Sequence, residues 1–222
     1  MIDLHTHTFL SDGVLIPSEL VRRAQMKGYR AMALTDHVDA SNVEILVPQL
    51  VEVCERLNAK GKIVLVPGVE ITHVPPSGLE AVVASARAAG ARMVVVHGET
   101  TVEPVAPGTD RAALELDIDV LAHPGLITRA EAVLAAKRGI ALEISARRGH
   151  SLSNGHVARI ALEAGALLVL NTDTHEPDDL LTYAQARRVA QGAGLKPREV
   201  DRLYATAGRL VEKVSGRRVK SS

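Results

Sequence analysis

The sequence is poor in aromatic and thiol side chains. Its 222 residues include no tryptophan, three tyrosines and a single phenylalanine, Phe9. Because proteins that grip single-stranded nucleic acid usually stack the bases on aromatic rings, this composition argues against that use. The one cysteine, Cys54, excludes an intrachain disulfide. It lies in the apolar-periodic run LVPQLVEVCERL, which predicts a buried thiol on a helix face.

Excess charge and long apolar runs are also missing. The 26 Lys and Arg residues balance 26 Asp and Glu residues, so no net charge draws the chain to nucleic acid or acidic membranes. No apolar run reaches the ~18 residues of a membrane-spanning helix. The start, MIDLHTH, lacks the basic and apolar regions of a signal peptide. We therefore expect a cytoplasmic protein whose residues 1–222 form one domain, and the sequence leaves its oligomeric state open.

Short apolar runs rich in β-branched residues alternate with helical patterns. Strands are expected at residues 2–6, 31–35, 63–66, 93–96, 119–122, 140–144 and 167–171. Most are apolar on both faces, which is typical of parallel strands covered on both sides. Several helical patterns end at a glycine, as helices often do, and Pro48 predicts a break within one of them. The alternation favours an α/β barrel or a doubly wound sheet.

Side chains that bind metals follow almost every expected strand. The carboxyl ends of parallel strands form the active-site face of such folds, and His, Asp and Glu are ligands of zinc, manganese and iron. A single histidine after a strand is more often a packing or capping residue. Six of the nine histidines fall at these ends, however, which indicates a shared metal cluster. His5 and His7 reinforce it, because residues i and i+2 of a strand point to the same side.

The ordered motifs DLHTHT-x-x-SDG, TDH, GVE, AHPG and D-x-H resemble those of the PHP family, named for polymerase and histidinol phosphatase. The resemblance extends from Ile2 to His175. It implies a distorted seven-stranded (βα)7 barrel, similar to a TIM barrel, with up to three metal ions at the carboxyl ends of the strands.

The resemblance further implies nine metal ligands in three groups. The first group is His5, His7, Glu70 and Asp173. The second is Glu70 again, as a bridge, with His97 and His123. The third is Asp12, His37 and His175. We therefore expect two to three divalent ions. Zinc, manganese and iron all suit this set, and the oxygen of Asp12, where some members carry histidine, favours manganese or iron at the third position.

Such a cluster suits phosphoester hydrolysis. Divalent ions lower the pKa of bound water toward ~7, which supplies a hydroxide nucleophile, and they neutralise charge on phosphoryl oxygens. We expect a metal-dependent phosphoesterase with Glu70, Asp173 and His175 at its catalytic centre. Its substrate would be a small phosphorylated metabolite, similar to histidinol phosphate or a nucleotide. Arg147 and Arg148 could clamp the phosphate, and a role for His150 as leaving-group acid or phosphate donor stays open.

Three other functions remain to be weighed. A nuclease would call for a basic groove or stacking aromatics. An amidohydrolase barrel usually has eight strands and does not require Asp12, His37 and His175. A metal-holding interaction module would tolerate missing ligands, and the nine positions are all filled by competent residues.

For several residues outside the nine expected ligands we expect structural or supporting roles. Asp3 and Asp36 could orient ligand imidazoles. For Glu143 we expect a salt bridge to an arginine, and for His73 a structural role in a turn. The basic end of the chain, with Arg217, Arg218 and Lys220, is expected to be a solvated tail. The segment 98–110 is the longest candidate active-site loop.

Overall fold

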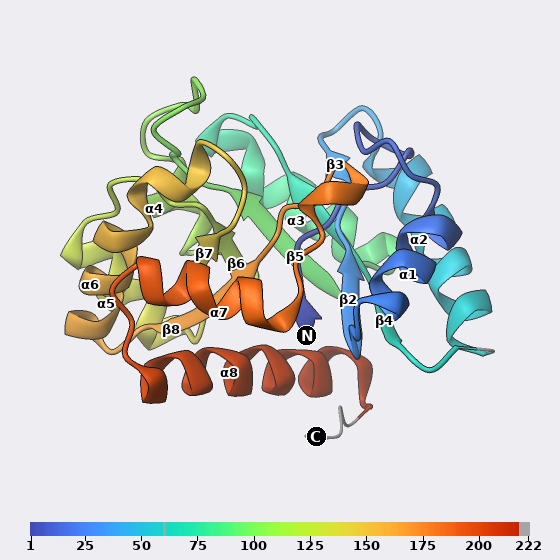
Figure 1. Cartoon of the computed structure of the whole chain (residues 1–222). Coiled ribbons are helices and arrows are strands. Elements are labelled where there is room, and N and C mark those ends of the chain that lie inside the picture. Colours follow the sequence, from blue (N-terminus) through green and yellow to red (C-terminus); the bar gives the residue numbers. More distant parts are fainter. Residues whose placement is uncertain (60, 218–222) are drawn as a thin grey trace.

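A computed structural model describes residues 1–59 and 61–217 of the chain. Parallel strands form its centre and are hydrogen-bonded in a single order. They are β1 (Ile2–Asp3), β2 (Ala31–Leu34), β4 (Val64–Ile71), β5 (Met93–His97), β6 (Val120–Ala122), β7 (Ala141–Ser145) and β8 (Leu167–Asn171). A short strand, β3 (His37–Val38), pairs with β4. The backbone beyond β1 and β8 also pairs, since the Asp173 N–H donates to the His5 carbonyl (3.0 Å) and the His7 N–H to the Thr174 carbonyl (2.9 Å). The expected seven-stranded barrel is confirmed and nearly closed (Figure 1).

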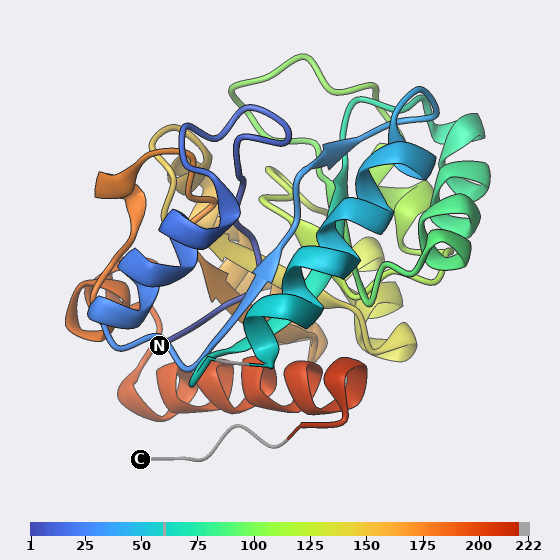
Figure 2. The same ribbon diagram turned by 90° about the vertical axis from the view of Figure 1, so that its right-hand side faces the viewer.

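Helices follow the strands and cover the outside of the barrel (Figure 2). They are α1 (Pro17–Met26), α2 (Val43–Asn58), α3 (Leu79–Ala89), α4 (Thr109–Ala113), α5 (Arg129–Arg138), α6 (Asn154–Ala164) and α7 (Tyr183–Gly192), with 3-10 turns η1 (Pro76–Gly78), η2 (His150–Ser153) and η3 (Pro177–Asp179). Each α-helix turns an apolar stripe to the barrel, as Leu20 and Ala24 of α1 illustrate. Within the described residues, the helices lack the combination of length and apolar character needed to cross a bilayer.

The last helix, α8 (Pro197–Ser215), lies across the N-terminal ends of the strands (Figure 1). Its residues Ala207, Leu210 and Val211 join an inner apolar cluster with side chains such as Val95 and Val169 that point into the barrel. Many inward residues are small, for example alanines on β2, β6 and β7, and these alanines are fully buried. With this end of the barrel packed, polar side chains gather at the other end.

Three local expectations were wrong. The strand expected at residues 2–6 is shorter, since β1 ends at Asp3, and His5 and His7 lie in the segment that follows it. The strand expected to end at Val66 continues as β4 to Ile71, through Pro67 and Gly68. A Cβ at Gly68 would lie 2.8 Å from the Cβ and carbonyl oxygen of Met93, so glycine permits the close approach of β4 and β5. As a result Glu70 lies within a strand and not after it.

The break expected at Pro48 does not occur, because α2 runs without interruption from Val43 to Asn58. A proline inside a helix costs ~3 kcal/mol, since it removes a hydrogen bond and crowds the preceding turn. Pro48 lies on the exposed side, while Leu46, Val47 and Leu50 are buried against the barrel. This burial holds the helix together across the proline. Cys54 is buried on the same helix, as expected. At the basic end of the chain, Arg217 is exposed, whereas Arg218 and Lys220 lie outside the described residues.

Candidate metal centre

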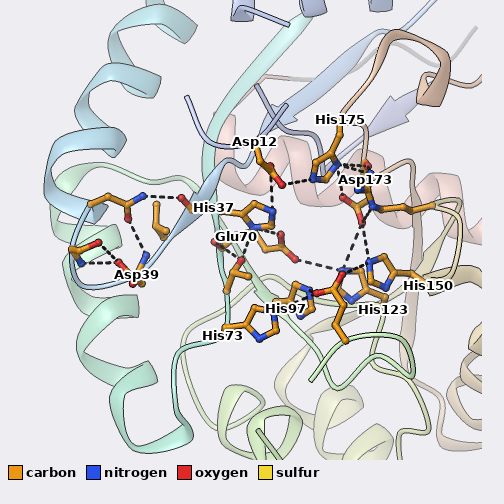
Figure 3. A pocket seen from close by; sticks show the side chains of 16 residues that line it. Asp12, His37, Asp39, Glu70, His73, His97, His123, His150, Asp173 and His175 are labelled. Atoms are coloured by element: carbon orange, nitrogen blue, oxygen red, sulfur yellow. Dashed lines mark hydrogen bonds and ion pairs between the residues drawn. The ribbon is translucent and has the colours of Figure 1, made fainter. Parts of the chain in front are cut away.

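A cavity of about 480 Å³ lies at the carboxyl ends of the strands, on the face opposite α8. Figure 3 shows imidazoles and carboxylates from different strands converging on it. Its lining includes Asp12, His37, Glu70, His97, His123 and His150, together with Asp173 and His175. Two of the expected ligands, His5 and His7, lie buried beneath these residues. The nine residues singled out as metal ligands are thus brought together at one end of the barrel.

The innermost group is His5, His7, Glu70 and Asp173. Nε2 of His5 lies 3.2 Å from Oε2 of Glu70, and Nε2 of His7 lies 3.2 Å from Oδ1 of Asp173. Both histidines point inward because Thr6, between them, points outward and donates to the Ala33 carbonyl at 2.7 Å. The alternation of side chains along the segment after β1 therefore delivers both imidazoles to one place, as expected.

Asp173 reaches this group through an unusual backbone conformation. Its φ is +53°, in the left-handed region, where aspartate and asparagine are enriched among residues other than glycine. The bond from its N–H to the His5 carbonyl fixes this turn after β8. Left-handed backbone at non-glycine residues tends to occur at functional sites, because the surroundings must hold it in place.

The outer group, expected from the motifs as the third, combines Asp12, His37 and His175. Oδ1 of Asp12 lies 3.5 Å from Nε2 of His37, and its Oδ2 lies 3.2 Å from Nε2 of His175. The ring of His7 lies beside both imidazoles, with centroid distances of 4.2 Å. The loop that carries Asp12 is held by Asp36, whose carboxylate accepts the N–H of Thr8 and the hydroxyl of Ser11, each at 2.7 Å. Asp36 therefore fixes a loop and does not orient an imidazole.

A third group consists of His97, His123 and His150, whose ring nitrogens lie within metal-binding range of one another. The rings of His123 and His150 stack with centroids 4.0 Å apart. Glu103, which the sequence did not single out, directs its carboxylate to this group, 3.0 Å from Nε2 of His97 and 3.3 Å from Nε2 of His150. It also lies 3.3 Å from His73, which lines the cavity instead of only shaping a turn.

Several buried polar atoms in this centre lack an oriented hydrogen bond within the described part of the chain. They include Nε2 of His5, Nε2 of His7 and Oε1 of Glu70. Buried polar atoms without a partner are costly and rare in folded proteins. Neutral imidazole nitrogens and carboxylate oxygens clustered in this way are suited to a shared divalent cation. The side chains therefore fit the metals that the motifs imply.

The protonation of the cluster reflects opposing effects of burial and charge. Burial lowers the pKa of His7 to about 4. For His37 burial acts in the same direction, but Glu70 and Asp12 outweigh it and raise the pKa to about 10. The hydrogen bond from His97 lowers the pKa of Glu103 to about 2. The carboxylates thus remain anionic at neutral pH and favour cations among them.

Glu143 supports the centre from beneath, and its expected salt bridge to an arginine was wrong. Its Oε2 lies 2.8 Å from Nδ1 of His5 and accepts the Asn171 amide at 2.9 Å. The barrel closes between β1 and β8, so β7 places this fully buried carboxylate beside His5. The contact occupies Nδ1 and directs Nε2 of His5 toward Glu70. Asp3, in contrast, accepts hydrogen bonds from the N–H and hydroxyl of Thr172 and so fixes the backbone.

The two arginines expected near the substrate differ in position. Arg147 lines the cavity, with one guanidinium nitrogen 2.7 Å from Nδ1 of His175 and 3.2 Å from the Asp173 carbonyl. Arg148 is exposed and is not among the described residues of the cavity wall. His150 lines the cavity as well, with its Nδ1 2.7 Å from the Thr100 hydroxyl.

Comparison with known proteins gives relatives that extend over most of the chain. An uncharacterised protein of Methanocaldococcus jannaschii is 46% identical over 201 residues, 90% of this chain and 92% of its own length. The DNA polymerase/3′-5′ exonuclease PolX of Bacillus subtilis is 30% identical over 84% of this chain, which spans only 36% of that protein. A protein of Shewanella pealeana named "probable phosphatase" is 27% identical, with 87% and 84% of the two chains covered.

Two solved structures share the fold at lower identity. A chain of archaeal ribonuclease P with mature tRNA has a TM-score of 0.75 at 17% identity and covers 100% of this chain and 97% of its own. Histidinol phosphate phosphatase of Lactococcus lactis, solved with zinc, L-histidinol and phosphate, has a TM-score of 0.64 at 19% identity, covering 88% and 94%. The sequence model of the PHP domain matches residues 3–172, more than half of the chain, and the protein therefore belongs to the PHP family.

Proposed function

We propose that this PHP-family metal-dependent phosphoesterase hydrolyses a small phosphorylated metabolite. The observation that carries the proposal is the gathering of nine imidazole and carboxylate side chains at one cavity of about 480 Å³, seven of them in its lining and two, His5 and His7, buried beneath it. Such a volume accommodates a small molecule and lies within the range of ordinary ligand sites. The relatives named as phosphatases support the same class of reaction.

The three groups at the cavity would hold two to three divalent ions. His5, His7, Glu70 and Asp173 would form the innermost position. Glu70 would also serve the position of His97 and His123, while Asp12, His37 and His175 would form the outer one. When bound, such ions activate water and offset charge on phosphoryl oxygens. Zinc, manganese and iron all suit these ligands.

The remaining side chains of the cavity would place the substrate. Arg147 would meet the phosphate, because a guanidinium presents two parallel N–H groups to phosphoryl oxygens. His150 lies next to His123 and can donate a proton or hydrogen bond to the leaving group. Glu143 would keep Nδ1 of His5 protonated and so hold that ring in its ligand orientation.

The charge of the cavity favours a small substrate over a nucleic acid. Among the described residues that line it, Arg147 carries the one fixed positive charge, whereas Asp39 and Glu103 add to the carboxylates of the metal groups. A nucleic-acid groove would require several cations along the backbone path.

A nuclease is the second candidate. The observation that favours it is the 30% identity to PolX over most of the chain. Removal of nucleotides from a strand end would need only one phosphodiester in the cavity, so the local geometry suits it as well.

Metal reconstitution followed by a substrate panel tests both candidates. The protein is loaded separately with Mn²⁺, Fe²⁺ and Zn²⁺ and assayed on histidinol phosphate, sugar phosphates, mononucleotides, bisphosphate nucleotides and short oligonucleotides. The proposal predicts the highest kcat/KM on a small phosphomonoester. Preference for oligonucleotides would replace it with the nuclease. If the protein retained less than one equivalent of metal after reconstitution, the metal centre itself would be refuted.

A further inference from the structure

Glu103 lies outside the nine ligands but reaches the same cavity. It belongs to the loop 98–110 after β5, which rises on the face opposite α8 in both views (Figures 1 and 2). Its side chain is 37% exposed, yet its two oxygens face three imidazoles. Oε2 lies 3.0 Å from Nε2 of His97 and 3.3 Å from Nε2 of His73, and Oε1 lies 3.3 Å from Nε2 of His150.

The base of the loop is fixed, so this placement is not an accident of a loose segment. The carboxylate of Glu99 accepts the N–H groups of Gly108 (2.9 Å) and Asp110 (3.1 Å). The carboxylate of Asp110 accepts the N–H of Glu99 in return, at 2.8 Å. These reciprocal bonds tie the two ends of the loop together. Thr100 then bonds to His150 within the cavity wall, which leaves Glu103 on the part of the loop that faces the metal groups.

The two ring nitrogens of His97 indicate whether Glu103 can bind the same metal ion. Nδ1 lies 3.2 Å from the carbonyl of Gly98, to which it donates, so Nε2 is the ligand atom that remains. Ligands of one tetrahedral ion, each ~2.0–2.2 Å from it, lie roughly 3.3–3.6 Å apart. The 3.0–3.3 Å separations between the Glu103 oxygens and Nε2 of His97 and His150 are close to this spacing. An ion bound at His97 would therefore have a carboxylate within reach.

We propose that Glu103 supplies a further, loop-borne carboxylate ligand to the ion held by His97 and His123. This inference rests on the metal centre of the proposed function. We also infer that binding of this ion tethers the loop 98–110 to the barrel. The loop is then held at Glu103 as well as at its base, so we expect it to open less often when that ion is bound.

The variant Glu103→Gln tests the proposal through binding and loop protection. The amide keeps the size of the side chain but is a much weaker ligand than a carboxylate. Bound Zn²⁺ and Mn²⁺ are titrated with a competing chelator, and hydrogen exchange of residues 98–110 is followed with and without metal. We expect one equivalent to bind at least about tenfold more weakly, since even residues that only support metal ligands contribute roughly 10–100-fold to affinity. The other equivalents should keep their affinities.

Hydrogen exchange should separate the ligand role from a general loss of charge. In the wild-type protein, metal is expected to slow exchange in the loop, and in Glu103→Gln this slowing should be lost. Glu163→Gln is the matched control, because Glu163 pairs with Arg159 on the outer helix α6, away from the cavity. Unchanged affinities and unchanged loop protection in Glu103→Gln would overturn the proposal. Failure of the wild-type protein to bind metal would instead refute the proposed function.

Discussion

Asp173 shows how much of this centre depends on single side chains. Its carboxylate lies 3.2 Å from Nε2 of His7, 3.4 Å from Nδ1 of His175 and 3.8 Å from Nε2 of both His5 and His123, so it lies near members of all three groups. Its left-handed backbone limits the residues that can replace it. Asparagine adopts that conformation readily, whereas alanine would add strain to the loss of the carboxylate.

We predict that Asp173→Asn lowers turnover by more than about 100-fold, because a group that binds the metal should matter more than outer partners, which contribute roughly 10–100-fold. The fold should survive, since the backbone conformation is compatible with asparagine. Steady-state kinetics and a thermal unfolding curve measure the two effects. Turnover near the wild-type value would remove Asp173 from the assigned centre.

Two loops bring carboxylates to the candidate metal centre from outside the strands of the barrel. The loop at residues 8–13 carries Asp12 and folds back tightly, because a Cβ at Gly13 would lie 2.5 Å from the His7 carbonyl oxygen. Side chains rarely approach backbone so closely, so glycine is required there. The loop 98–110 is held by the reciprocal bonds of Glu99 and Asp110.

Replacing Gly13 with alanine should therefore displace Asp12. We expect Gly13→Ala to destabilise the protein by about 1–3 kcal/mol, the usual range for overpacking, and to weaken metal binding. Urea unfolding and metal titration measure these changes. Gly192→Ala is the control, since a Cβ at this helical position meets no atom within 4 Å. If both variants behave alike, the close approach at Gly13 has no consequence.

Asp110, in the loop 98–110, makes the stability of the folded protein depend on pH. Burial raises its pKa to about 8, although the N–H of Glu99 opposes the shift. The folded state thus holds a proton that the unfolded state releases near pH 4, so stability falls as the pH rises toward 8. Asp110→Asn keeps an acceptor for the Glu99 N–H and removes this titration. Its free energy of unfolding relative to wild type should increase from pH 5 to pH 8 in urea titrations.

Asp117→Asn is the control variant for the pH dependence of Asp110→Asn. Asp117 has an 82% exposed side chain that pairs with Arg87, and its replacement should change stability little across the same pH range. Parallel pH profiles for Asp110→Asn and the wild-type protein would contradict a buried, protonated Asp110.

At the scale of the whole molecule, closure of the barrel builds the centre. It places residues 5–7 beside residues 171–175, from opposite ends of the matched domain, while α8 packs the N-terminal end. The result concentrates eight imidazoles with several carboxylates in one place, a set of side chains suited to binding divalent cations.

Removal of the metals should consequently lower the stability of the entire fold. A ligand present at 1,000 times its Kd stabilises the native state by about 4 kcal/mol. For a chain of this size such a change corresponds to roughly 8–16 °C in Tm. Calorimetry before chelation, after chelation and after restoring Mn²⁺ or Zn²⁺ measures this shift. An unchanged Tm would mean that bound metal contributes little to the stability of the native state.

Much of the fold was predictable because its signals are local. Apolar runs and glycine helix ends located the strands and most helices. The end of the strand before Gly68 and the break at Pro48 were expected wrongly because packing overrode local preference: two strands approach closely at Gly68, and burial of the opposite helix face outweighs the hydrogen bond missing at Pro48. The cytoplasmic location stays a prediction.

The sequence by itself determined which residues gather at the carboxyl ends of the strands, because alternation and parallel order send His5, His7 and their counterparts to one end of the barrel. Only the tertiary structure decided the partners of those residues. Glu143 meets His5 across 138 positions of sequence through the closed barrel, and Glu103 meets His97 through the conformation of a loop. Contacts of this kind arise from the packing of distant segments, which no local pattern of residues encodes.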